Sequence, residues 1–521
     1  MKKQVAAGLL SVTMCASMLA GCAGSKAESK EAAVSAAAGT QTEAAEAGAA
    51  GTQTGTAETQ TEAAPQETTN IVVYYRGSKQ NAEKLVVEEM NKYSEEKIGV
   101  TITLNSVDSS EYKDKLSMDL AAQNEIDLCW MANYTGLQSL AEQDALMELS
   151  DLLPDYPELY AVMPEKIWES TEYGGKRYFV PNYKESFTSY SVMTPKAMAD
   201  TVKEKYGIDF QTIQCNGITD LANYEEYILA CMEEGAEFPI PNLIAFKTWM
   251  AGDSRYELLE DVYVADKETH QVMTYYETPE FAEYVKLMKH WNELGIRREE
   301  GLLSDFKPDP YLQSGSYAIS GWSTIPDNEN QASSRYGVDV YVKEATQKTV
   351  VNTSATGSGW AIAQHSKKAD ACLKWLTLLN TDTEFADLFA YGLEGVNYNV
   401  ESDGQVAAIK DSGWSNSVWK ITNYKIASLT TADAPDKKEQ YDQYNNEAVE
   451  MVHLGFRPDL TAYSAEKATI KAIDTEAQKM FDYGLYGEDK LAEVIGDMNK
   501  AGLENVKAEI QKQLDEFVAA K

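Results

Sequence analysis

From residue 70 onward, short apolar runs alternate with segments of helical periodicity. The run 71–75 is apolar throughout and stops at Arg76-Gly77-Ser78, which is typical of a buried strand. Apolar residues then recur at helical spacing from 82 to 93, and Gly99 ends that segment. The same reasoning predicts strands at 100–104 and 126–130 with a helix at 111–122 between them. This β-α-β-α-β order predicts a parallel sheet covered by helices.

Parallel sheets of this kind bind ligands beyond the carboxyl ends of their strands. Three segments follow those ends here: Arg76-Gly77-Ser78, Val107-Asp108-Ser109, and 131–134 with its Asn-Tyr pair. We therefore expect a binding face at this edge of the sheet.

The later chain continues the mixed pattern. Gly-Gly-Lys at 174–176 predicts a hairpin turn, followed by a strand at 178–180 that Pro181 stops. Two further strands, at 316–322 and 357–363, each carry a Gly-Trp pair, and a helix is expected at 369–379. The C-terminus is predicted to be helical, with one apolar face in its last helix formed by Leu503, Val506, Ile510, Leu514 and Phe517.

The first 22 residues have the organisation of an export signal. Lys2 and Lys3 precede an apolar stretch at 5–20 that is short for a membrane span. It ends in Leu19-Ala20-Gly21-Cys22, which resembles the bacterial lipobox, whose cysteine is acylated, as with palmitate, and becomes the mature N-terminus. We expect residues 1–21 to be a signal peptide and Cys22 to hold the protein at the outer face of a membrane.

Residues 23–69 have a different composition from the rest of the chain. They are rich in Ala, Thr and Glu, contain no aromatic residue, and repeat TQTEAA at 40–45 and 59–64. No hydrophobic core can form from such a segment. We expect a disordered tether between the lipid anchor and the folded part.

Charge and cysteine content narrow the function classes. The chain has 82 acidic and 46 basic residues, a formal charge of −36, which disfavours nucleic-acid binding and docking on anionic lipid. A chain of 521 residues is longer than a single hydrophobic core usually supports, so two or more lobes are expected. The six cysteines include no C-x-x-C, and the four after Cys22 are expected to be buried thiols rather than disulfides.

The order of these motifs resembles a known family. A lipobox, a tether, a βαβ unit, a Gly-Lys-x-Tyr-x-x-Pro hairpin and two Gly-Trp strands follow one another as in the extracellular solute-binding proteins of ABC importers, of the carbohydrate-binding, maltose-binding-protein-like type. The segment 391–398, YGLEGVNY, and the helix within 502–517 resemble a larger lipoprotein branch of that family with its own C-terminal module. The resemblance covers about residues 70–521.

The resemblance implies an α/β, two-lobed periplasmic-binding-protein-like fold of type II, with a cleft between the lobes and hinge crossings. Lobe 1 is expected at 70–183 and about 355–450, and lobe 2 at 184–354 and about 451–521 with the helical C-terminal module. The resemblance also implies that the ligand is a carbohydrate, and we expect an oligosaccharide. The partners that it implies are the permease subunits of an ABC transporter. We expect a monomer at the extracellular or periplasmic side of the cell membrane, without nucleic acid, metal or cofactor.

Sugar recognition needs aromatic faces for the C–H surfaces of the rings, and carboxylates, amides and arginine for the hydroxyl groups. The candidates lie at predicted strand ends, at the predicted crossing near Pro181, in the branch-specific segment and, for Trp249, beside Met250-Ala251-Gly252. The predicted ligand-binding residues are Arg76, Asp108, Trp130, Asn133, Tyr134, Asn182, Tyr183, Glu185, Trp249, Trp322, Trp360, Glu394, Asn397 and Tyr398. For each, the alternative is packing or a solvated surface; Lys184 and Glu185 alternatively pair with each other, and Trp168, Trp291 and Trp375 are expected in the core.

No catalytic constellation is found. The four histidines (270, 290, 365 and 453) form no H-E-x-x-H, and no G-x-S-x-G, P-loop, dinucleotide fingerprint or EF-hand loop occurs. An enzyme is therefore not expected. Two alternatives stay open: a peptide or other polar solute as the ligand, and a secreted glycoside hydrolase with paired carboxylates.

Overall fold

The computed structural model describes residues 68–243, 245–250 and 254–520. The predicted signal peptide, the lipobox cysteine and nearly all of the predicted tether lie outside this part of the chain. Within it, buried apolar residues form two large cores and a small third one.

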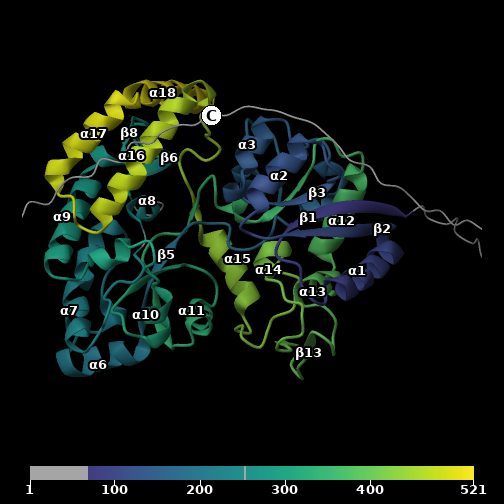
Figure 1. Ribbon diagram of the computed structural model, residues 1–521, viewed down its shortest axis with the longest axis horizontal. Helices are drawn as coiled ribbons and strands as arrows, with labels where there is room; N and C mark the ends of the chain where they lie inside the picture. Colours follow the sequence, from purple (N-terminus) through teal and green to yellow (C-terminus); the bar gives the residue numbers. More distant parts are fainter. Residues whose placement is uncertain (1–67, 244, 251–253, 521) are drawn as a thin grey trace, which may run out of the picture. The chain divides into compact units, whose positions relative to one another are not determined.

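The first core defines lobe 1, drawn at the right of Figure 1, and takes its buried residues from 71–187 and 350–454. Its elements are β1 (Thr69–Arg76), α1 (Glu83–Ile98), β2 (Val100–Val107), α2 (Tyr112–Ala121), β3 (Leu128–Met131), α3 (Leu137–Glu142), α4 (Pro157–Tyr160), α5 (Glu165–Ser170), β4 (Val180–Pro181), β12 (Gly359–Ile362), α12 (Ala369–Thr381), α13 (Thr383–Tyr391), β13 (Tyr398–Val400), β14 (Val406–Ala408), α14 (Val418–Ile421) and α15 (Lys437–Glu447).

The main sheet of lobe 1 has the strand order β2-β1-β3-β12-β4. β1 pairs in parallel with β2 and β3, which confirms the predicted β-α-β-α-β unit, and β12 returns antiparallel between β3 and β4. α1 ends where Gly99 adopts φ of 68°, and the backbone N–H of that residue donates to the Glu95 carbonyl. The carboxyl ends of β1, β2 and β3 therefore share one edge of the sheet.

The second and third cores define lobe 2, drawn at the left of Figure 1, with buried residues from 192–345 and 456–514. Its elements are β5 (Tyr190–Pro195), α6 (Lys196–Tyr206), α7 (Glu225–Glu233), α8 (Phe246–Trp249), β6 (Tyr256–Glu260), β7 (Tyr263–Asp266), β8 (Val272–Thr274), α9 (Pro279–Glu293), α10 (Asp309–Ser314), β9 (Ser320–Ser323), α11 (Asn328–Tyr336), β10 (Val340–Glu344), α16 (Ser464–Asp482), α17 (Leu491–Lys500) and α18 (Leu503–Ala520). Two antiparallel sheets, β10-β5-β9 and β6-β7-β8, carry these helices.

Core membership changes three times along the chain, so three segments cross between the lobes: 188–191, 346–349 and 455 with its neighbours. The first two crossings meet where Thr188 pairs with Thr349, and the strand β11 (Thr349–Val350) pairs in parallel with β15 (Val449–Glu450), just before the third crossing. The first crossing lies after the predicted Pro181-Asn182 position, and the predicted lobe boundaries stay a proposal.

Two predicted strands were too long. The strand expected at 178–180 begins only at Val180 and, contrary to the expectation, includes Pro181, which an edge strand tolerates. The strand expected at 316–322 begins at Ser320, because Ala318 and Ile319 donate instead to the carbonyl of Pro239.

Several other predictions are confirmed. Four of the five predicted face residues of α18 are buried, and Phe517 lies half-buried against Phe456. Trp168, Trp291 and Trp375 are fully buried, and Cys129, Cys215, Cys231 and Cys372 are buried free thiols. No helix in the described ranges is long and apolar enough to cross a membrane.

Candidate functional site

The predicted binding edge of the lobe 1 sheet carries exposed polar and aromatic groups. Arg76 ends β1, and its guanidinium carbon lies 5.6 Å from the ring centre of Trp130 and 5.5 Å from that of Tyr134. Tyr134 is 51% exposed, and its neighbour Asn133 is also exposed. We call Arg76, Asn133 and Tyr134, together with Trp419 and Lys420 of α14, the strand-end face.

Lys420 reaches this face from far along the chain. Its ammonium nitrogen lies 4.2 Å from the ring centre of Tyr75 and 6.0 Å from that of Trp130. Burial, together with the positive charge of Arg76, lowers the pKa of Lys420 to about 8. Arg76 and Lys420 are therefore two cations that contact the same Trp130 ring and repel each other.

Buried tryptophans hold α14 at the strand ends. The last carbonyl groups of a helix have no partner within the helix. Here the indole N–H of Trp130 donates to the Lys420 carbonyl at 2.6 Å, that of Trp360 to the Ile421 carbonyl at 3.0 Å, and the Ser358 hydroxyl to the Trp419 carbonyl at 2.5 Å. These bonds fix Trp419, whose side chain is 37% exposed, and Lys420 on the face.

A cavity of about 430 Å³ lies where the crossing segments meet lobe 2. Its volume is within the range of small-molecule sites. Both hydroxyl and charged groups line it, from the crossings and from the region around β6: Thr188, Tyr190, Lys247, Met250, Glu257–Asp261, Lys267, Thr349, Val351–Thr353 and Met451. We call it the crossing cavity.

A buried carboxylate supports one wall of this cavity. Glu257 accepts hydrogen bonds from the backbone N–H of Val452 and from Nδ1 of His453, at 2.7 and 2.9 Å. His453 in turn lies 2.9 Å from Nδ1 of His270. Burial raises the pKa of Glu257, but these hydrogen bonds outweigh it, and the pKa lies below its usual value. The network ties the third crossing to β6.

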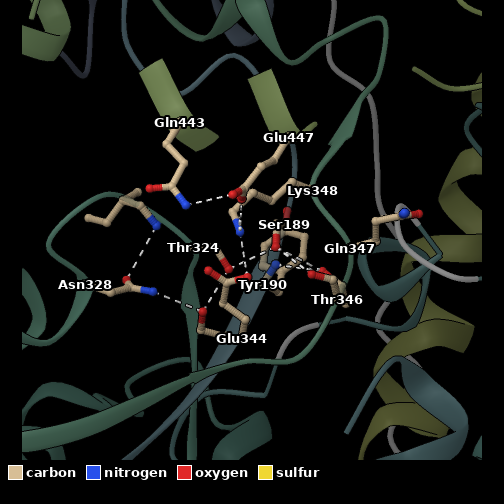
Figure 2. Close-up of polar contacts among 12 residues, drawn as sticks. Ser189, Tyr190, Thr324, Asn328, Glu344, Thr346, Gln347, Lys348, Gln443 and Glu447 are labelled. Carbon is tan, nitrogen blue, oxygen red and sulfur yellow. Dashed lines mark hydrogen bonds and ion pairs between the residues drawn. The ribbon is translucent and has the colours of Figure 1, made fainter. Parts of the chain in front are cut away.

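A second polar network joins the crossings to α11 and α15, as Figure 2 shows. The Ser189 hydroxyl donates to the Thr346 carbonyl at 2.8 Å and lies 3.0 Å from the Thr324 hydroxyl. Lys348 pairs with Glu344 of β10 at 2.7 Å and lies 3.6 Å from Glu447 of α15. Side chains of both lobes therefore meet at the crossings.

The predicted site residues fall into distinct places. Arg76, Asn133 and Tyr134 meet at the strand-end face. Asp108 is exposed at the end of β2, where the hydroxyls of Ser78 and Ser110 donate to it and hold its pKa at about 2. Their contact with a ligand stays a prediction.

Three predicted tryptophans have no surface to offer a ligand in this structure. Trp130 and Trp360 are fully buried, and their indole N–H groups are used in hydrogen bonds to carbonyl groups of α14. Trp249 is 1% exposed because it packs in the core of lobe 2. The half-buried Trp322 packs edge-on against Tyr336 at 5.9 Å, and its indole nitrogen has no partner among the described residues.

The predicted residues at the first crossing are held by their neighbours. Asn182 is 2% exposed and its amide donates to the Trp419 carbonyl at 3.4 Å. Tyr183 is buried and donates to Asp442 of α15. Glu185 pairs with Lys184 at 2.5 Å, which is the alternative that the sequence left open for these two residues.

The branch-specific segment forms a turn of its own. The side chain of Asn397 is 1% exposed and its hydrogen-bonding groups are satisfied within the protein. Its Oδ1 accepts from the Leu393 N–H at 3.0 Å, and its Nδ2 donates to the Ser412 carbonyl at 3.1 Å. Tyr398 packs edge-on against Tyr391, and Glu394 is exposed. Structural stabilisation therefore explains Asn397.

Sequence reasoning missed Lys420, Trp419, Lys247 and the residues 349–353. No local pattern distinguishes them, because α14 and the second crossing reach the site only through the fold. The described residues contain no cluster of three or more His, Cys, Asp or Glu that could hold a metal ion.

Comparisons with known proteins agree with this architecture. The family described as bacterial extracellular solute-binding protein matches residues 88–412, and a domain of unknown function (DUF3502) matches 452–519. A carbohydrate ABC transporter substrate-binding protein of Streptococcus pneumoniae serotype 4 is 25% identical over 464 residues, 87% of this chain and 91% of that protein.

Solved structures share the fold. The N-glycan transport solute binding protein NgtS of Streptococcus pneumoniae is 22% identical and superposes with a TM-score of 0.75, covering 87% of this chain and 99% of that one. The substrate binding protein FusA of the same organism, in complex with kestose, is 15% identical with a TM-score of 0.57, covering 87% and 100%. These findings confirm the predicted two-lobed α/β fold class and the predicted family: the chain belongs to the bacterial extracellular solute-binding proteins.

Proposed function

We propose that this protein captures an oligosaccharide between its two lobes and delivers it to the permease of an ABC importer. The observation that carries the proposal is the strand-end face, where the exposed ring of Tyr134 lies beside the donors of Arg76 and Asn133. An aromatic face with adjacent hydrogen-bonding groups matches the alternating C–H and hydroxyl surfaces of a sugar. The carbohydrate-binding relatives add support.

We further propose that the protein is anchored by lipid at Cys22 and acts as a monomer. The lipobox-like sequence before Cys22 supports the anchor. Replacing Cys22 with alanine should move the protein from the membrane fraction to the medium, which fractionation and immunoblotting measure. Membrane retention of that variant would contradict the anchor.

Glycan binding is tested by isothermal titration against a panel that includes mannose- and N-acetylglucosamine-containing oligosaccharides. Tyr134→Ala should weaken the binding about 3- to 10-fold, because the stacking surface is lost, worth about 0.5–1.5 kcal/mol. Tyr206→Ala, which removes another exposed tyrosine on α6, is the matched control and should leave affinity unchanged.

The same panel separates the remaining alternatives. Binding of peptides with no response to any glycan would replace the sugar with a peptide. Release of reducing ends from a bound glycan would make the protein a hydrolase. Either result would overturn the proposed function.

A further inference from the structure

Arg76 and Lys420 are cations without an anionic partner. Within the described ranges, neither side chain has a carboxylate within 4.0 Å or a hydrogen-bond acceptor; their contacts are with the rings of Tyr75, Trp130 and Tyr134.

Three other cations of the lobes are paired with carboxylates. Lys184 at the first crossing, Lys247 at the crossing cavity and Lys368 beside β3 each lie 2.5 to 2.9 Å from a carboxylate oxygen. The nearest acidic group that influences Arg76 is Asp108, whose two oxygens already accept from Ser78 and Ser110. Asp108 therefore acts on Arg76 only at longer range, and among the described residues neither Arg76 nor Lys420 forms an ion pair within 4.0 Å.

The surrounding structure fixes both cations in place. Arg76 lies over two rings, so its position is set by cation–π contact while its N–H donors remain available. The indole N–H of Trp130 donates to the backbone carbonyl of Lys420 and so fixes this residue. The ammonium nitrogen of Lys420 lies 3.3 Å from the position that a Cβ atom would occupy at Gly77. Glycine at 77 thus leaves room for the two cations to share one site.

We propose that Arg76 and Lys420 form a subsite for the carboxylate of an acidic sugar unit, such as a sialic or uronic acid, carried by the bound glycan. A guanidinium fork beside an ammonium suits a carboxylate, which accepts hydrogen bonds on two oxygens. The exposed ring of Tyr134 lies next to this pair, where the sugar ring bearing the carboxylate would stack. The proposal rests on the proposed glycan-binding function and narrows its substrate class.

The repulsion between the two cations supports this assignment. Because burial and Arg76 lower the pKa of Lys420, an anion between the two groups should raise that pKa again. Binding of an acidic glycan should then take up a proton above about pH 8 and weaken as the pH rises further. A neutral glycan should show no such dependence.

The test uses matched glycans and the purified protein in isothermal titration. One set is a sialylated biantennary N-glycan, its carboxyl methyl ester and its desialylated form; a second is a uronic-acid oligosaccharide and its carboxyl-reduced form. We expect at least one acidic member to bind ten-fold or more tightly than its neutral counterparts. Arg76→Gln and Lys420→Gln should each weaken binding of the acidic forms about ten-fold more than binding of the neutral forms, and so remove most of that preference.

Two controls keep the test decisive. Lys79→Gln removes a nearby exposed charge outside the cluster and should leave the preference intact, which separates a local subsite from general electrostatics. Thermal melts identify any variant that fails to fold, and the pH dependence of the unmodified protein then provides the second readout.

Equal or weaker binding of the acidic forms would overturn the subsite while leaving the glycan function in place. The same holds if the variants weaken acidic and neutral forms equally. If no glycan of either kind binds, the proposed function itself fails, and the subsite fails with it.

Discussion

Buried tryptophans act in this protein as anchors for a distant segment. Trp130 and Trp360 lie on neighbouring strands, and both use their indole N–H to bind carbonyl groups of α14. A four-residue helix has little stability of its own, because forming its first turn is unfavourable. Its position at the strand-end face therefore depends on these side chains, which influence the site without touching a ligand.

Trp360→Phe should test this role. The substitution keeps an aromatic ring but leaves the Ile421 carbonyl without its donor, at a cost of about 1–3 kcal/mol. Trp375→Phe is a matched control, because Trp375 is equally buried and its indole nitrogen has no partner among the described residues. We expect urea unfolding to show a larger loss for Trp360→Phe, and titration to show weaker glycan binding. Equal losses for the two variants would contradict the anchoring role.

At the scale of elements, the C-terminal helices belong to lobe 2. Although the match to a domain of unknown function sets 452–519 apart, Leu503, Val506, Ile510 and Leu514 of α18 are fully buried in the same core as α9. Gln511 adds hydrogen bonds to the Val272 N–H and the His270 carbonyl. The module therefore supplies part of the lobe's core.

A chain that stops at residue 502 should not fold stably. The truncation removes four buried aliphatic side chains and exposes the core surface that they cover, and the burial of each contributes about 1.5–3 kcal/mol. Their sum is comparable with the whole stability of a domain, about 5–15 kcal/mol. We expect loss of the cooperative thermal transition of lobe 2 and rapid proteolysis within 192–345. A chain ending at 519 keeps all four side chains and should melt like the full protein. A stable, protease-resistant chain ending at 502 would make α18 dispensable.

At the scale of the whole molecule, local patterns predicted the elements and the fold better than the site. The strands at β1, β2 and β3 are visible as apolar runs, and their parallel order follows from the helices between them. The local sequence could not predict that Trp360 is buried and hydrogen-bonded, because its partner Ile421 lies 61 residues away in the chain. Lys420 could not be found for the same reason, since it reaches Arg76 only when α14 docks on both tryptophans.

Away from the crossings, polar contacts among the described residues also join the start of α11 in lobe 2 to the segment around α15 in lobe 1. Asp327, just before α11 of lobe 2, accepts a hydrogen bond from the Ala434 N–H of lobe 1 at 2.8 Å, and its own N–H donates to Gln440 of α15 at 2.7 Å. Gln331 of α11 adds a bond to Asp433 at 3.1 Å. In a protein whose lobes close around a ligand by hinge motion, such bonds bias the balance between arrangements.

Asp327→Gly should shift that balance. Asp327 has φ of 57°, a conformation that glycine and asparagine tolerate, so this variant removes the carboxylate without backbone strain. Loss of about 1–1.5 kcal/mol of inter-lobe hydrogen bonding corresponds to roughly a 5- to 10-fold change in the population ratio. Spin labels on cysteines introduced at the exposed positions Lys84 and Glu204 report the distance between the lobes, because the native cysteines of the folded part are buried. Asp327→Asn keeps an acceptor for Ala434 and should behave like the unmodified protein. If both variants give the same distance distribution, the contact does not control the lobes, and the balance is set by the crossings alone.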